Sequence, residues 1–408
     1  MEYSYKIIIK IIAFIIIGLY YNINIISKFH NFISYISFKI ETQEIENYLN
    51  ICKNFKIIKK YKIMSNPKIS IISPIYNRER FIYRFLTSIQ FQDFTDIEII
   101  LVDDCSIDSS VKIIEDYKKK DKRIILIKNK NNKGTFIARN IGVLYAKGKY
   151  IILPDPDDIL LKGIISFCYN NAEKFNYEII RFTIYNWNKK LAYEKYVQKL
   201  GNKPVYDPLL STNLFYGYGE LEIIDYNINN KFIKTITFIK ALNCLNNFYF
   251  NMQMIIFEDL LMNYIILVNA KSFYFSKRIG YYYLRNEMSI KKNENKMSKI
   301  IIIKHIFIIL KILFKYSKNT KYAKDMFNLH FTKLNRRFII GNKLANLSSK
   351  EDLNFYYYTI NLFLNCKFIT NENKYYLNKL KKIIKNKYIC LNKINAKKYL
   401  KKNKIFLF

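Results

Sequence analysis

Short apolar runs alternate with longer amphipathic segments from Lys68 onward, and this alternation restricts the fold more than any other feature of the sequence. The predicted strands lie at 68–77, 97–104, 123–129 and 150–153. The predicted helices between them lie at 78–90, 109–120 and 135–148. Unbroken apolar runs such as IEIILV are typical of parallel strands that are covered on both faces. The alternation therefore predicts an α/β, Rossmann-like fold with a mostly parallel sheet flanked by helices.

Polar residues gather where three of these predicted strands end, in the stretches SPIYN, VDDCS and PDPDD. The carboxyl ends of parallel strands meet at one edge of a sheet, which is where ligands bind in this architecture. In the last stretch, Asp155, Asp157 and Asp158 would repel one another at neutral pH, although the chain has 68 Lys and Arg against 32 Asp and Glu. A turn rich in aspartate that caps a helix near Ile159 explains one of these carboxylates well and three poorly.

Composition narrows the chemistry. The formal net charge of +36 suggests nucleic acid or an anionic membrane as partner. Abundant Ile, Lys, Asn, Tyr and Phe, with few Gly and Pro, instead indicate the codon bias of an AT-rich genome. We favour this second explanation and expect no nucleic-acid partner, because the lysines are scattered. No CxxC pair occurs among the six cysteines, and all three histidines lie outside 66–290. A general base within that span is therefore expected to be a carboxylate.

The two ends of the chain differ from its middle. Residues 1–27 contain an apolar run, 6–27, that reaches spanning length only if its polar residues are accepted; a signal anchor is expected, with a signal peptide or a buried helix as alternatives. We expect a stalk or linker helix at 28–66, a catalytic domain at 67–295 and a basic helical C-terminal region at 296–408. The protein is thus expected to be membrane-associated, through a single N-terminal pass, and a cytoplasmic location stays open.

Taken together, the motifs resemble glycosyltransferase family 2, whose members have the inverting GT-A fold. The resemblance rests on SIISPIYN, EIILVDDCSIDSS, NKGTFIARNIG and GKYIILPDPDD, and it extends to FEDLLMNYIILVNA and GYYYLRNEMSI. It covers roughly residues 66–290. Cys105 departs from the pattern, since relatives usually have a small residue such as Gly there. Pro154 is a second departure and restricts Leu153 to an extended conformation.

The resemblance implies a metal site among the aspartates. A divalent ion, Mn²⁺ or Mg²⁺, neutralises the diphosphate that leaves a nucleotide-sugar, and hard oxygen ligands hold it. Asp155 and Asp157 would form the DxD element, with Asp157 as the direct ligand. Asp155 would face the ribose or the metal through water, and Asp158 would support the turn.

The resemblance also assigns the nucleotide-binding residues. Pro74 and Tyr76 would lie along a uracil ring, and Asp103 or Asp104 would accept a hydrogen bond from it or contact the ribose. The remaining expected contacts to the nucleotide-sugar come from Asn77, Gly134, Arg139, Asp155 and Arg285. Structural roles compete with these: core packing for Tyr76, turn formation for the two aspartates, and a salt bridge for Arg139.

The acidic pair at 258–259 is the expected catalytic site. Direct displacement at the anomeric carbon inverts its configuration and needs one base, which the resemblance assigns to Asp259, with Glu258 binding or orienting the acceptor. Acids at a capped helix N-terminus are the structural alternative. We therefore predict a hexosyl or N-acetylhexosaminyl transferase that moves a sugar from a UDP-sugar to a hydroxyl of a glycan, protein or lipid. The alternatives are a polyprenyl-phosphate glycosyltransferase that uses GDP- or UDP-sugar, and a non-catalytic nucleotide-sugar-binding protein.

Overall fold

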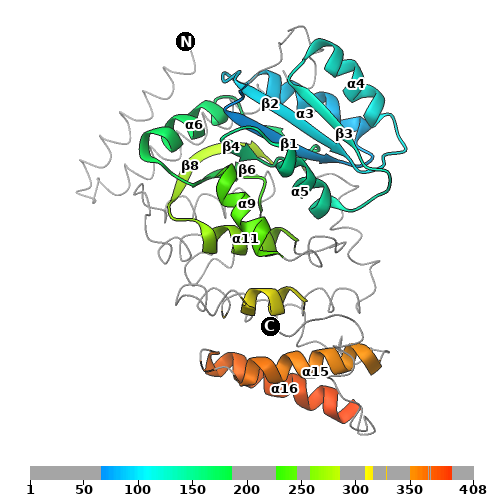
Figure 1. The fold of residues 1–408 in the computed structure, drawn as a ribbon, viewed down its shortest axis with the longest axis vertical. Helices are drawn as coiled ribbons and strands as arrows, with labels where there is room; N and C mark the ends of the chain where they lie inside the picture. Colours follow the sequence, from blue (N-terminus) through cyan, green and yellow to red (C-terminus); the bar gives the residue numbers. More distant parts are fainter. Residues whose placement is uncertain are drawn as a thin grey trace, which may run out of the picture. The chain divides into compact units, whose positions relative to one another are not determined.

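The computed structural model describes residues 66–185, 227–245, 258–284, 308–315, 328, 350–365, 367 and 369–387 (Figure 1). The chain divides into two compact units, Met1–Lys56 and Ile57–Phe408, and all described residues belong to the second. The expected anchor at 1–27, all of the expected stalk except its last residue, and Arg285 lie outside the described residues.

A single eight-stranded sheet forms the centre of the described region, in the order β3-β2-β1-β4-β7-β6-β8-β5. The first four strands along the chain are β1 (Ile69–Ile75), β2 (Ile97–Asp103), β3 (Ile124–Lys128) and β4 (Tyr150–Ile152). The other four are β5 (Ile159–Leu160), β6 (Ile179–Tyr185), β7 (Lys231–Lys234) and β8 (Phe273–Tyr282). Strands β1 to β4 pair in parallel, as the sequence predicted, and β7 continues the sheet antiparallel to β4. The predicted fold class is confirmed.

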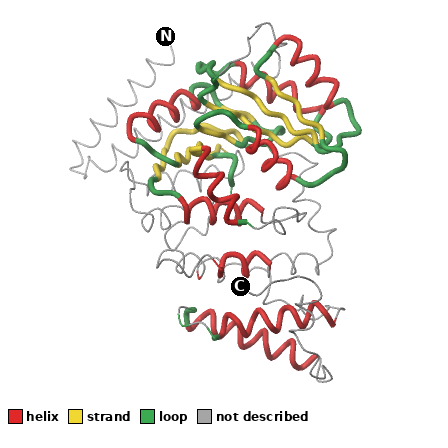
Figure 2. Tube along the Cα trace, viewed as in Figure 1, coloured by secondary structure: helices red, strands yellow, loops and turns green. Residues whose placement is uncertain are grey.

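Both faces of the sheet are covered by helices, which is why every residue of β1 and β2 is buried. Ile71 packs with helices α3 (Glu79–Gln90), α4 (Ser110–Lys120) and α6 (Ile164–Phe175). The next residue, Ile72, points to the opposite face and packs with α5 (Thr135–Tyr145), α9 (Thr235–Cys244) and α11 (Glu258–Asn269). Figure 2 shows these two helical layers with the sheet between them. The alternation of side chains along a strand thus places α5 and α11 on the same side.

No helix begins at Ile159, so the alternative interpretation of the aspartate-rich turn as a helix cap is wrong. Ile159 and Leu160 form the short strand β5, which pairs antiparallel with Tyr282 and Tyr281 of β8. The helix α6 starts only at Ile164, after Gly163 in a left-handed conformation. Pairing with a strand from far along the chain overrides the local helical pattern, so the aspartate-rich turn leads into a strand.

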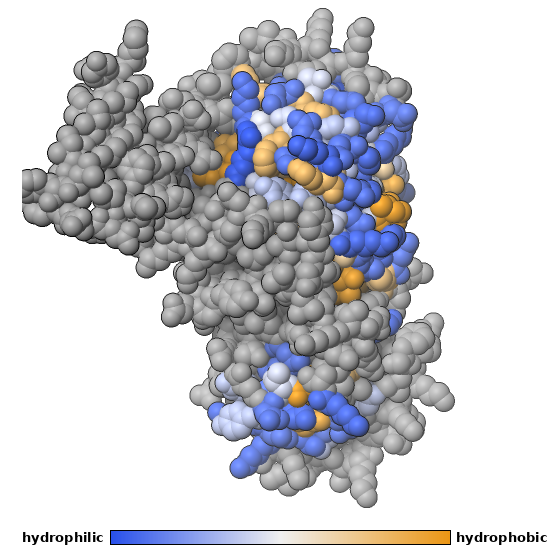
Figure 3. Space-filling view, turned by 90° about the vertical axis from the view of Figure 1, so that its left-hand side faces the viewer, coloured by the Kyte–Doolittle hydropathy of each residue, from blue (hydrophilic) through white to orange (hydrophobic). Residues whose placement is uncertain are grey.

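The described C-terminal residues are helical, in agreement with the expectation for this region. Helices α15 (Lys350–Leu364) and α16 (Asn371–Lys387) pack against each other through buried side chains that include Tyr356, Ile360 and Leu377. Within the described residues, no helix is both long and apolar enough to cross a bilayer. On the face drawn in Figure 3, hydrophilic residues predominate among the described ones and hydrophobic residues are scattered between them.

Candidate active site

Arg139 joins two carboxylates that lie far apart in the sequence. Its Nη1 donates to Oδ1 of Asp259 at 2.7 Å, and its Nη2 donates to Oδ1 of Asp155. Arg139 comes from α5, Asp155 from the loop after β4, and Asp259 from the first turn of α11. The guanidinium is buried, whereas the two carboxylates keep 27% and 29% of their side-chain surface exposed. The structure therefore brings Asp155 of the predicted DxD element and the predicted base to one partly open acidic cluster.

Burial and mutual repulsion control the charges in this cluster. Burial raises the pKa of Glu258 to about 8, and the neighbouring Asp259 adds to the shift. The pKa of Asp259 is also raised by burial, although Arg139 partly offsets the effect. Burial alone would lower the pKa of Arg139, but Asp259 and Asp155 raise it, so its positive charge is permanent. Arg139 thus supplies a fixed positive charge beside all three carboxylates, and the pKa values of Glu258 and Asp259 are raised by burial.

Strand β7 and the residues just before it supply two polar residues, Lys231 and Asn229, that the sequence motifs did not indicate. The antiparallel pairing of Ile152 with Phe232 brings the residues before β7 alongside those after β4. Asn229 accordingly donates from Nδ2 to Oδ2 of Asp155 at 3.0 Å. Lys231 is buried, donates to Asn230 Oδ1 at 3.1 Å, and lowers the pKa of Asp259 by its charge. Their roles depend on a strand pairing that no local pattern announces.

The two remaining aspartates of the turn have different surroundings. Asp158 is buried and accepts hydrogen bonds from the Tyr281 hydroxyl at 2.8 Å and from the Leu284 N–H at 2.9 Å. Burial, followed by repulsion from Asp157 and Asp155, raises its pKa well above the usual value. Asp157 is half-buried, and its main-chain carbonyl accepts from Arg84 Nη2 at 2.9 Å. The predicted supporting role of Asp158 agrees with these bonds.

This donor set fits a hard divalent ion. Mg²⁺ is commonly held by one or two carboxylates, with waters and substrate phosphates as its other ligands. In the described part of the chain, no group of three or more His, Cys, Asp or Glu residues is arranged to enclose a metal. Asp157 with Asp155 therefore suits an ion that shares its coordination with a phosphate, and does not suit one enclosed by protein.

The two aspartates at the end of β2, Asp103 and Asp104, differ in their hydrogen bonds. Asp104 accepts hydrogen bonds from Asn129 Nδ2 at 2.8 Å and from the main-chain N–H groups of Lys133 and Gly134 at 2.9 and 2.7 Å. It thereby fixes the loop before α5, where Gly134 has a φ of 86° that favours glycine. Asp103 has only the Ser106 N–H, at 3.3 and 3.4 Å from its two oxygens. Asp103 is thus the better placed of the two predicted contacts to the nucleotide.

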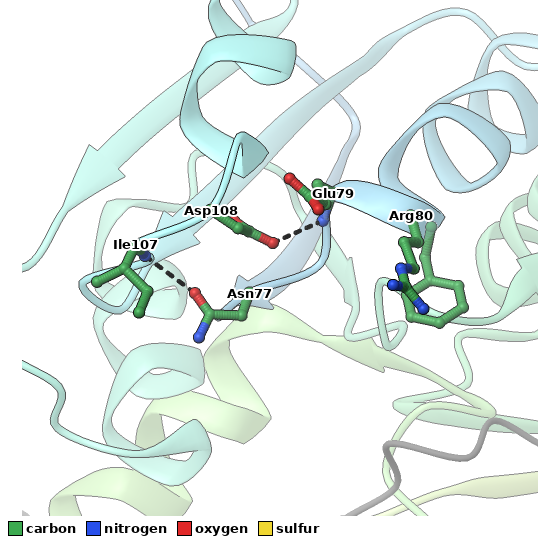
Figure 4. A pocket seen from close by; sticks show the side chains of 6 residues that line it. Asn77, Glu79, Arg80, Ile107 and Asp108 are labelled. Atoms are coloured by element: carbon green, nitrogen blue, oxygen red, sulfur yellow. Dashed lines mark hydrogen bonds between the residues drawn. The ribbon is translucent and has the colours of Figure 1, made fainter.

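The loops after β1 and β2 fasten each other. Asn77 accepts from the Ile107 N–H at 2.9 Å through its side chain, and Asp108 accepts from the Glu79 N–H at 3.0 Å (Figure 4). Glu79, the first residue of α3, in turn accepts from the Ser109 N–H at 2.9 Å, so the starts of α3 and α4 each receive a carboxylate from the other segment. We call this exchange of caps the loop brace. A pocket of about 340 Å³ lies beside it, lined by Asn77, Glu79, Arg80, Phe81, Ile107 and Asp108. It contains none of the acidic cluster.

The other predicted residues are placed as follows. Pro74 is buried inside β1 opposite Val102, whereas Tyr76, which follows the strand, is 43% exposed. Of these two residues, Tyr76 therefore has exposed surface that a nucleobase could contact. Cys105 has a φ of 69°, in the left-handed region that favours glycine, which explains why a glycine suits this position in relatives. Arg285 lies outside the described residues, and its neighbour Leu284 bonds to Asp158.

Several known proteins resemble this chain in sequence. Residues 70–233 match "Glycosyl transferase family 2". "Glycosyltransferase GlyG" of Streptococcus pneumoniae is 33% identical over 121 residues, which cover 30% of this chain and 40% of that protein. "GalNAc(5)-diNAcBac-PP-undecaprenol beta-1,3-glucosyltransferase" of Campylobacter jejuni is 38% identical over 109 residues, covering 26% and 35%.

A solved structure shares the fold. Staphylococcus aureus TarS in complex with UDP-GlcNAc superimposes with a TM-score of 0.58 at 16% identity, over 82% of this chain and 92% of that one. The two curated relatives are matched over about two fifths or less of their own length. What the likeness establishes is the nature of the domain that holds the acidic cluster. The chain carries a family 2 glycosyltransferase domain with the GT-A fold, as its motifs predicted.

Proposed function

We propose that this chain is a metal-dependent, inverting glycosyltransferase that moves a sugar from a UDP-sugar to an acceptor hydroxyl. The observation that carries the proposal is the bridge from Asp155 through Arg139 to Asp259, because it puts a carboxylate suited to the donor beside one suited to the acceptor. The UDP-GlcNAc bound to TarS, on the same fold, supports a uridine nucleotide as the donor carrier.

On the donor side, Asp157 and Asp155 would hold Mn²⁺ or Mg²⁺, whose charge offsets that of the leaving diphosphate. Asn229 and Arg139 orient Asp155 by one hydrogen bond to each of its oxygens. Because these two residues fix the carboxylate before any ligand arrives, little reorganisation is needed when the diphosphate binds.

On the acceptor side, Asp259 would remove the proton of the attacking hydroxyl. Arg139 engages Oδ1 of this carboxylate, and no described residue donates to Oδ2, which is the oxygen we assign to the acceptor proton. The raised pKa of Asp259 makes it a stronger base than an exposed aspartate. Glu258, which is protonated at neutral pH by its own raised pKa, would donate a hydrogen bond to the acceptor instead of competing as a base.

The nature of the acceptor is suggested by one of the relatives. The Campylobacter relative is described as acting on a polyprenyl-diphosphate-linked glycan, so a lipid-linked glycan is the first acceptor to test.

The test uses purified full-length protein with UDP-GlcNAc, UDP-glucose and GDP-mannose, each with and without Mn²⁺. Asp157→Asn should abolish the Mn²⁺-dependent binding of the donor. Asp259→Asn should keep UDP affinity and lose transfer by about 10²- to 10⁴-fold, the range of general-base catalysis. Asp116→Asn is the matched control, because Asp116 is an exposed aspartate of α4 paired only with Lys119. Normal turnover in Asp259→Asn would refute the assignment of the base.

A further inference from the structure

One tyrosine hydroxyl connects both ends of the aspartate turn. Tyr281 of β8 is fully buried, and its hydroxyl accepts from the Asp155 N–H at 3.0 Å while it donates to Oδ2 of Asp158 at 2.8 Å. The Asp158 N–H also bonds to the Asp155 carbonyl, at 3.2 Å. The turn that presents Asp157 is therefore closed by main-chain and side-chain bonds together.

The position of this hydroxyl is itself fixed by packing. Tyr281 pairs with Leu160 of β5, the strand that follows the turn, so the same segment of β8 contacts the turn and its continuation. The preceding Gly280 packs so closely that a Cβ atom would lie 2.3 Å from Ile164 and 2.7 Å from Phe182. The tyrosine thus reaches the turn from a rigid strand.

We propose that Tyr281 is a positioning residue for the metal-binding turn, and that Asp158 anchors this turn to Tyr281 and Leu284 without being a metal ligand. The inference rests on the proposed function, since it presumes a divalent ion at Asp157. Asp158 is buried and both of its oxygens accept hydrogen bonds from β8 and the residues after it, whereas Asp155 keeps 27% of its side-chain surface exposed to a ligand. Outer residues that orient metal ligands typically contribute 10- to 100-fold to metal affinity.

The experiment measures Mn²⁺ affinity in the presence of saturating UDP, by calorimetry, for wild type and Tyr281→Phe. This variant removes a single oxygen atom and keeps the ring. We expect Mn²⁺ to bind about 10- to 100-fold more weakly, with metal-free UDP affinity unchanged. Tyr274→Phe is the matched control, because Tyr274 lies in the same strand and stacks on Tyr177. It should leave Mn²⁺ affinity as in wild type.

A second variant separates an anchor from a ligand. Asp158→Asn should also weaken Mn²⁺ binding, and the loss in the double variant should be smaller than the sum of the two single losses, because the two changes share the bond between Tyr281 and Asp158. Loss of all Mn²⁺ binding in Asp158→Asn, as expected for Asp157→Asn, would show that Asp158 is a ligand. Unchanged Mn²⁺ affinity in a folded Tyr281→Phe protein would also overturn the inference. If wild type bound UDP but no Mn²⁺, the metal dependence of the proposed function would fail, and this inference with it.

Discussion

Replacing Arg139 by methionine should destabilise the protein strongly at pH 8 and much less at pH 5. Methionine keeps most of the buried volume and removes a guanidinium that donates to both Asp155 and Asp259. Breaking a buried ion pair by removing one partner costs about 3–5 kcal/mol. Since each carboxylate is more than one quarter exposed, we expect the low end of this range, about 3 kcal/mol.

The pH dependence gives this prediction its sign. Without Arg139, Asp259 loses the charge that lowers its pKa and keeps the repulsion from Asp155, so its folded pKa rises further above the unfolded value. A raised folded pKa means that the native state binds more protons than the unfolded state, and stability is then lost as pH rises through the folded values. Lowering the pH to 5 should therefore restore part of the lost stability.

The assay is urea unfolding of wild type, Arg139→Met, Asp259→Asn and the double variant at both pH values. A coupling free energy of about 1–3 kcal/mol between Arg139 and Asp259 is expected at pH 8. Arg123→Met is the matched control, because Arg123 forms a buried ion pair with Asp121 away from the cluster and should add independently to Asp259→Asn. Additive behaviour of Arg139→Met with Asp259→Asn, or an equal loss at both pH values, would refute the view that one cation serves both acids.

Two further predictions concern residues at the edge of the site. Glu258→Gln should flatten the fall in melting temperature between pH 5 and 8. A glutamate whose folded pKa is about 8 keeps a proton in the native state over this range, whereas the unfolded chain has released it. Parallel curves for wild type and variant would contradict this. Cys105→Gly should raise the free energy of unfolding by about 0.5–1 kcal/mol, measured with urea. Glycine removes the backbone strain of a left-handed non-glycine residue, and this gain outweighs the added freedom of the unfolded chain. A loss of stability would show that packing of the thiol contributes more than the backbone strain costs.

The sequence was sufficient to predict strands β1 to β4, because each of these strands can be recognised from its own short stretch of residues. Each parallel strand from β1 to β4 is an apolar run followed by polar residues, so the sequence pattern located these strands and the edge of the sheet where the polar residues gather. The motif series likewise identified Asp155 and Asp259, although only the structure shows that Arg139 joins them.

The rest of the site depends on pairings between distant segments. Asn229 reaches Asp155 only because β7 runs antiparallel to β4, and Tyr281 reaches Asp158 only because β8 pairs with β5. Asn229 stands in none of the sequence motifs, and Tyr281 lies in GYYYLRNEMSI, which does not distinguish it from the two tyrosines that follow. For the same reason, the different hydrogen-bond partners of Asp103 and Asp104 could not be predicted from the positions of these two residues in the sequence.

The loop brace has a consequence for changing donor specificity. Because Asp108 accepts from the first residues of both α3 and α4, and Glu79 of α3 accepts from the residue before α4, a new sequence in either segment disturbs the starts of both helices. Loop exchange with a relative that prefers another nucleotide should therefore succeed only when the two loops are transplanted as a pair. Natural diversification of the donor in such proteins would then proceed through matched changes at two places in the gene.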